Sequence, residues 1–152
     1  MILLHSMVNK ISSYLLALVF IVLVQSAFAS PVSNNSTTDW NTASGWTPSG
    51  VPNLVIWNGS QHAVVSHNKT SGSLIVKNGN SIRVTSGAIL TINGNLTLGY
   101  SSSLTVDIGA TLIITGSLLA TNSPSTITID GVLNVGGNYS VSTSGVTHNH
   151  SG

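Results

Sequence analysis

The chain has 152 residues, a formal net charge of +1 and no cysteine. With four Lys or Arg residues and three acidic residues, all aspartates, it lacks the basic surface that nucleic acid requires, so no nucleic-acid partner is expected. Without cysteine, a disulfide framework and thiolate zinc sites are excluded.

Residues 1–29 have the pattern of a signal peptide. Lys10 precedes an uncharged apolar run over 14–24, and Ala27-Phe28-Ala29 offers a small-x-small cleavage site before Ser30. A retained transmembrane anchor is the alternative, but the run is shorter than the roughly 20 residues that span a bilayer. We therefore expect a secreted, extracellular or cell-surface protein whose mature form has no membrane partner.

Two short segments without repeats follow the leader. Residues 30–38 are polar and are expected to form a flexible tail. Residues 39–53 contain Trp40 and Trp46 together with two prolines, which predicts a tryptophan-rich cap over the open end of the next domain. Trp57 follows on the first expected strand of that domain.

Residues 54–141 repeat with a period of 22. Apolar-x-apolar triplets are separated by steps of 8, 8 and 6 residues over most of this range, beginning at Leu74, Ile82, Leu90, Leu96, Leu104, Leu112, Leu118, Ile127 and Leu133. Two series of glycines keep the same spacing, namely Gly72, Gly94 and Gly116, and Gly87, Gly109 and Gly131. A fixed period of this length indicates a repeat architecture.

The triplets predict very short strands, because alternate side chains of a strand point to opposite faces. Three such strands per repeat, stacked repeat upon repeat, make an all-β fold, a right-handed parallel β-helix (β-solenoid) with about 22 residues per rung and about four rungs. Looser triplets at 54–56 and 63–65 are expected to open it. An antiparallel sandwich is the alternative, although its strands are normally longer.

Residues 142–152 are expected to be a polar C-terminal tail, too polar to cover the last rung. The open end would then expose Leu133, Val135 and Val141. Unpaired strand edges invite pairing with another chain. We therefore expect end-to-end self-association, which builds fibres if the contact is head to tail.

The cap and the repeats together resemble β-solenoid segments of bacterial surface proteins. These are adhesin-like, autotransporter-like or type IX-secreted proteins that open with a Trp-Asn and a second Trp ahead of a Gly-x-Pro. The matching segments are Asp39-Trp40-Asn41, Gly45-Trp46, Gly50-Val51-Pro52 and the repeats Gly87-Ala88-Ile89-Leu90 and Gly109-Ala110-Thr111-Leu112. Gly45 stands where those proteins usually have Asn. The resemblance implies an exported solenoid.

Two sets of residues are candidates for chemistry. Trp40, Trp46 and Trp57 could stack on a polysaccharide, or could simply pack as a cap. Asp107 and Asp130 fall at one corner of successive rungs, where they could bind calcium, form a lyase-like acidic pair, or hydrogen-bond their own turns. No cofactor is expected, and calcium at Asp107 and Asp130 is the one alternative.

We expect a structural or adhesive surface module that binds itself or other surface proteins, and not an enzyme. A carbohydrate-binding module is the alternative. A polysaccharide lyase is a weaker one, because lyases of this fold need clustered Asp, Lys and Arg and the chain holds few of them.

Overall fold

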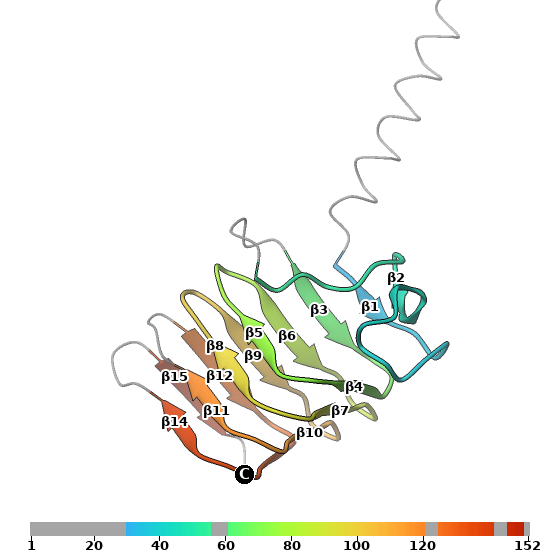
Figure 1. Ribbon diagram of the computed structural model, residues 1–152. Coiled ribbons are helices and arrows are strands. Elements are labelled where there is room, and N and C mark those ends of the chain that lie inside the picture. The colour runs from blue at the N-terminus through green and yellow to red at the C-terminus, as the bar shows by residue number, and fades with distance from the viewer. Residues whose placement is uncertain (1–29, 56–60, 121–124, 142–145, 151–152) are drawn as a thin grey trace, which may run out of the picture.

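The computed structural model describes residues 30–55, 61–120, 125–141 and 146–150. The described residues form a β-solenoid built almost wholly of parallel strands, and Figure 1 shows the strands stacking along one axis in chain order. This confirms the predicted fold class. Within these described ranges the one helical element is a single 3-10 turn, Ala43–Gly45.

Three sheets make up the solenoid. The largest, sheet A, has the order β15-β12-β9-β6-β3-β1-β2, sheet B has β13-β10-β7-β4, and sheet C has β14-β11-β8-β5. Sheet A contains β1 (Val32–Ser33), β2 (Trp46–Thr47), β3 (His62–Val65), β6 (Ser81–Val84), β9 (Ser103–Val106), β12 (Ser125–Ile129) and β15 (Val146–His150). Sheet B contains β4 (Lys69–Ser71), β7 (Ile89–Ile92), β10 (Thr111–Ile114) and β13 (Val132–Val135). Sheet C contains β5 (Leu74–Val76), β8 (Leu96–Leu98), β11 (Leu118–Ala120) and β14 (Tyr139–Val141).

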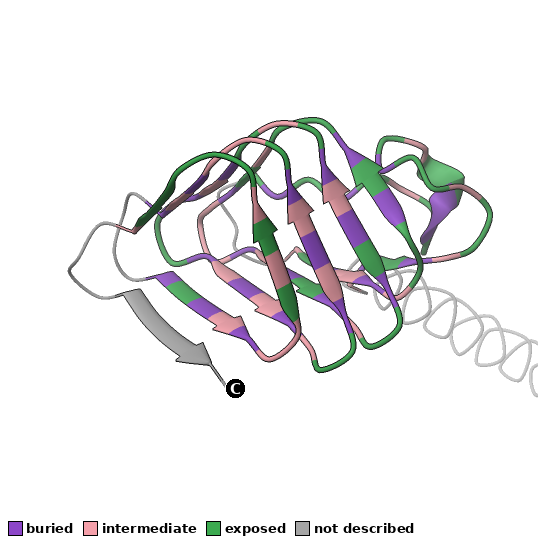
Figure 2. Cartoon of the chain, turned by 90° about the horizontal axis from the view of Figure 1, so that it is seen from below, coloured by how far each residue is buried: buried purple, intermediate pink, exposed green. Residues whose placement is uncertain are grey.

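The strand register follows the predicted period. Leu90 pairs with Leu112 and Leu112 with Leu133, so equivalent aliphatic residues lie above one another in sheet B. In the middle rungs the inward positions are buried while the intervening ones are half-buried or exposed, as the alternating colours of the strands in Figure 2 show. In the last rung the inward positions of β13 are half-buried. The core is therefore a column of Leu, Ile and Val side chains, held in place by burial of apolar surface.

A second column, of polar side chains, links the rungs at the corner before sheet C. The Asn95 backbone N–H donates to Ser73 Oγ at 3.0 Å, and the Ser117 N–H donates to Asn95 Oδ1 at 2.8 Å. The Asn138 N–H in turn donates to Ser117 Oγ at 3.0 Å. These side chains satisfy backbone donors that the bend takes out of the sheet ladders.

The N-terminal segments differ from the sequence-based expectation. Residues 30–38 are not a free polar tail, because β1 pairs in parallel with β3 and antiparallel with β2, and Ser33 is buried. The Ser33 hydroxyl accepts hydrogen bonds from the backbone N–H groups of Ser66 and His67, which holds this polar segment in place. Leu54 and Val55, expected to open the solenoid as a strand, instead lie in a turn.

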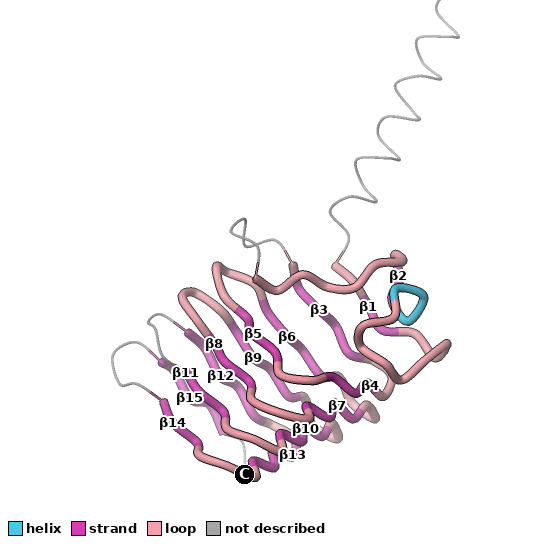
Figure 3. The backbone as a smooth tube through the Cα atoms, viewed as in Figure 1, coloured by secondary structure: helices cyan, strands magenta, loops and turns pink. Residues whose placement is uncertain are grey.

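The C-terminal segment also differs. Within 142–152, expected to be a polar tail, the strand β15 pairs in parallel with β12 along its whole length and becomes the edge of sheet A. The tube in Figure 3 shows how the strand rows of the solenoid line up from rung to rung. The sequence did not predict this strand because residues 146–150 have no apolar alternation.

Candidate functional site

A buried lysine holds the N-terminal end of the solenoid together. The Lys69 side chain leaves β4 toward the interior and is 1% exposed. Its ammonium donates hydrogen bonds to the backbone carbonyls of Asn34, at 3.2 Å, and Thr37. It also lies 5.6 Å from the centre of the Trp46 ring, within cation–π range. Burial lowers the pKa of the Lys69 ammonium below its usual range, and the nearby Asp39 carboxylate partly opposes that shift.

The two described tryptophans are packed against this lysine and against each other. Their ring centres are 4.7 Å apart in an edge-to-face arrangement, and Trp46 Nε1 donates to the Trp40 carbonyl at 2.9 Å. Trp40 is 2% and Trp46 1% exposed. Of the two alternatives for Trp40 and Trp46, the burial fits the packed cap and not the sugar-stacking surface, because neither ring face reaches solvent. Trp57 lies outside the described residues.

Gly45 lies directly against the Lys69 ammonium. A Cβ at this position would lie 2.9 Å from Lys69 Nζ and 2.8 Å from Thr37 Cγ2. A larger residue at position 45 would therefore require the Lys69 or Thr37 side chain to shift. The role of Lys69 was not predicted from the sequence, although one signal was available. Lys69 is one of only four Lys or Arg residues in the chain, and a single lysine in a segment without other charges needs an explanation.

The two aspartates share a corner as predicted, but the Arg83 side chain is ion-paired with Asp107 there. Val106 pairs with Ile129, and each of these residues directly precedes one of the two aspartates. Asp107 and Asp130 therefore lie at the same corner in successive rungs. Arg83 Nε lies 3.1 and 3.0 Å from the two carboxylate oxygens of Asp107. This guanidinium repels a second cation, so the donor set fits calcium poorly. No cluster of three or more His, Cys, Asp or Glu residues occurs within the described part of the chain.

The three residues of the expected assembly end belong to the last strands of two sheets. Leu133 and Val135 lie on β13 and Val141 on β14, and all three are partly buried against the core. Two neighbouring side chains are more open, because Val132 is 51% and Tyr139 45% exposed. In the described ranges no strand lies beyond β13 or β14 in its sheet.

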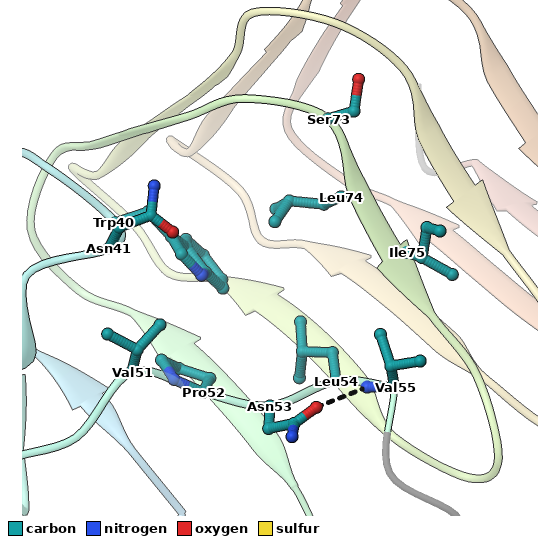
Figure 4. Close-up of a pocket in the computed structure, with 10 residues that line it drawn as sticks. All are labelled: Trp40, Asn41, Val51, Pro52, Asn53, Leu54, Val55, Ser73, Leu74 and Ile75. Carbon is teal, nitrogen blue, oxygen red and sulfur yellow. Dashed lines mark hydrogen bonds between the residues drawn. The ribbon is translucent and has the colours of Figure 1, made fainter.

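An open groove lies beside β5, near the other end of the stack. Its volume is about 490 Å³, which falls in the range of ligand sites. Residues 51–55 run along one side and Ser73–Ile75 along the other, with Trp40 and Asn41 at one end (Figure 4). The lining is mainly aliphatic, carries two amides and one hydroxyl, and has no charged side chain. The sequence analysis did not identify this groove.

The groove has a defined floor and wall. The Val55 N–H donates to Asn53 Oδ1 at 3.2 Å, which shapes the turn at 53–55. The Lys77 N–H donates to the Leu54 carbonyl at 3.0 Å, which attaches the same turn to the end of β5. Val51, Val55 and Ile75 are 39%, 44% and 49% exposed, so apolar surface lines the opening.

No protein-family profile, curated protein or solved structure matches the chain. The resemblance to adhesin-like surface proteins therefore stays a prediction, while the β-solenoid rests on the structure itself. In the part of the chain that the structure describes, no helix has the length and apolar character needed to cross a membrane.

Proposed function

We propose that the chain is a structural or adhesive β-solenoid module of an exported surface protein. The observation that supports this is the outer surface of the stack. Most of its outward strand positions are uncharged, and they hold both threonines (Thr70, Thr91 and Thr97) and aliphatic residues (Ile75, Ile113 and Leu119). A long, regular and nearly uncharged surface suits repeated weak contacts with other surface proteins or with polysaccharide.

The same architecture supports self-association through the C-terminal strands. The outer edges of β13 and β14 have backbone groups oriented to pair with another strand. A second copy or another surface solenoid would supply such a strand. This contact does not require a catalytic centre, which agrees with the proposal of a non-enzymatic module.

Export is the part of this proposal that is tested most directly. The 152-residue chain should be expressed with its leader in a secreting bacterial host, and the product outside the cytoplasm should be analysed by intact-mass spectrometry. We expect a mass that begins at Ser30. Ala29→Leu, which removes the small residue at the cleavage site, should leave the leader attached. A full-length wild-type product retained in the cytoplasm would contradict the proposal.

A further inference from the structure

The backbone of β5 presents unpaired hydrogen-bonding groups to the groove. Leu74 N–H donates to the Asn95 carbonyl at 2.9 Å, and the Val76 carbonyl accepts from the Gly99 N–H at 2.7 Å, so both residues face β8. In a parallel ladder the residue between them turns its N–H and C=O to the opposite edge. That residue is Ile75. In the described ranges β5 is the last strand of sheet C on this side, and its edge forms the wall of the groove.

In the other two sheets, a segment from the N-terminal part of the chain covers the edge that corresponds to the β5 edge. In sheet A, β1 covers the edge of β3, with the Val64 N–H donating to the Pro31 carbonyl at 2.9 Å. In sheet B, residues 38–40 cover β4, with the Trp40 N–H donating to the Thr70 carbonyl at 2.9 Å. The chain thus supplies an extra, irregular rung to two sheets.

Sheet C receives only the end of that rung. The Leu54 carbonyl accepts from Lys77 N–H just beyond β5, and Asn78 Nδ2 donates to the Val55 carbonyl at 3.2 Å. Ahead of this contact, residues 51–53 diverge from β5 and the groove opens between them. The missing element is therefore a short extended strand beside Ser73–Ile75.

We propose that this groove binds an extended, uncharged peptide strand of a partner protein, which adds to sheet C by pairing with the Ile75 N–H and C=O. Strand addition of this kind takes its affinity from main-chain hydrogen bonds and its specificity from pockets for alternate side chains. Every lining residue is uncharged, so a charged segment would lose its hydration without gaining a partner. The aliphatic walls favour a strand with aliphatic residues at alternate positions. This inference depends neither on export nor on self-association.

The test uses the chain from Ser30 onward, which contains every described strand. The probe is a peptide with the sequence of residues 101–106, acetylated and amidated so that it carries no charge. Hydrogen exchange followed by NMR should show a fast-exchanging Ile75 amide in the free protein and a protected one with peptide bound. The Leu74 amide donates to the Asn95 carbonyl, and the Val76 amide faces β8 within the ladder. Both should therefore be protected with and without peptide.

Two controls isolate the main-chain contact. Two versions of the peptide are N-methylated at alternate backbone nitrogens, one at the odd positions and one at the even positions. At least one of them should bind about tenfold more weakly than the unmethylated peptide, because it has lost the N–H groups that complete the ladder. Ile75→Pro removes the edge N–H while leaving the β5–β8 ladder intact, since proline is tolerated on edge strands. This variant should lose peptide binding with an unchanged circular dichroism spectrum.

A matched pair of charged variants tests the location. Ile75→Lys places a charge at the groove and should weaken peptide binding, whereas Ile108→Lys, at a turn where the side chain is 72% exposed, should not. The proposal is overturned if the Ile75 amide is already protected in the free protein, or if the methylated and unmethylated peptides bind equally. The proposal is also overturned if the chain dimerises without peptide and Ile75→Lys abolishes that dimer, because the groove would then bind a second copy.

Discussion

Glycines with the same spacing meet different physical requirements. Gly87 and Gly109 have φ of 81° and 76°, in the left-handed region that favours glycine. Gly131 continues the same series of 22, but a Cβ there would lie 2.3 Å from the Asp107 carbonyl oxygen and 2.5 Å from that of Ala110. The repeat therefore conserves the residue type along the solenoid while the reason changes from backbone conformation to close approach of neighbouring rungs.

This difference predicts unequal costs of adding a methyl group. Gly131→Ala should lower the free energy of unfolding by about 3 kcal/mol or more, because two backbone carbonyls cannot move aside without separating the rungs. Gly87→Ala has no atom within 4 Å of the new Cβ and should cost only about 1–2 kcal/mol of backbone strain. Urea denaturation followed by circular dichroism measures both. Equal losses would show that close approach does not govern position 131.

At the scale of the element, the sequence predicted the regular strands and missed the irregular ones. The triplets at Leu90, Leu112 and Leu133 were found because inward burial imposes apolar alternation. β4 escaped notice because its inward residues are Lys69 and Ser71, whose burial is satisfied by hydrogen bonds and cation–π contact that no periodicity encodes. β1 and β15 escaped for a related reason, since their pairing depends on edges that other strands provide.

The candidate sites were likewise predictable where they follow from the repeat, and not where they depend on side-chain rotamers or on the irregular segment. Adjacency of Asp107 and Asp130 followed from the period, because equal spacing along a solenoid places residues at the same corner. The Arg83 contact on Asp107 depends on a side-chain rotamer, which spacing does not determine. The burial of Trp40 and Trp46 and the groove beside β5 depend on how an irregular segment folds back over the stack. No repeat pattern describes that segment.

The extra rung formed by residues 32–40 should depend on Lys69. Lys69→Met keeps the apolar stem but removes the donor to the Asn34 and Thr37 carbonyls. We expect a loss of about 1–3 kcal/mol in the free energy of unfolding, since buried acceptors are left without a partner. Amides of β1 should become exposed to hydrogen exchange before those of β6 and β9. Uniform protection of β1 and β6 in the variant would contradict this role.

The lowered pKa of Lys69 adds a pH dependence with a definite sign. Between its folded pKa and the unfolded value of 10.5, the unfolded chain binds more protons, so the wild-type free energy of unfolding rises with pH. The Met variant lacks this group. The stability difference between wild type and Lys69→Met should therefore widen in favour of wild type as pH rises toward 10.5. Partial burial raises the pKa of Tyr139, but that effect is common to both proteins and cancels. If the stability difference between the two proteins stayed constant or narrowed with rising pH, the lowered pKa of Lys69 would be contradicted.

At the scale of the whole molecule, the two ends of the stack are unlike. At the N-terminal end β2 runs antiparallel to β1, and the tryptophan pair is buried beside the Lys69 ammonium. A rung of another copy therefore cannot extend sheets A and B there, and among the described strands only the β5 edge of sheet C stays open at this end. At the other end β13 and β14 keep the parallel direction of the solenoid, and apolar side chains at Val132 and Tyr139 are open to solvent.

This asymmetry predicts how the chain self-associates. Two copies meeting through β13 and β14 use the same surface twice, and such an isologous contact closes at a dimer, whereas a head-to-tail contact would grow into fibres. Because β1, β2 and residues 38–40 cover sheets A and B at the N-terminal end, a full rung cannot stack there, and we expect sedimentation of the chain from Ser30 to show a monomer–dimer equilibrium as concentration rises. Val132→Lys should shift it toward monomer by placing two like charges across the contact, and Val135→Lys should do the same if its melting temperature is retained. Ile108→Lys, which adds the same charge at a turn remote in sequence from both strands, should leave the equilibrium unchanged. Growth beyond the dimer would mean that the N-terminal end also takes part in contacts between copies, and a strict monomer at high concentration would remove the C-terminal strands as a contact surface.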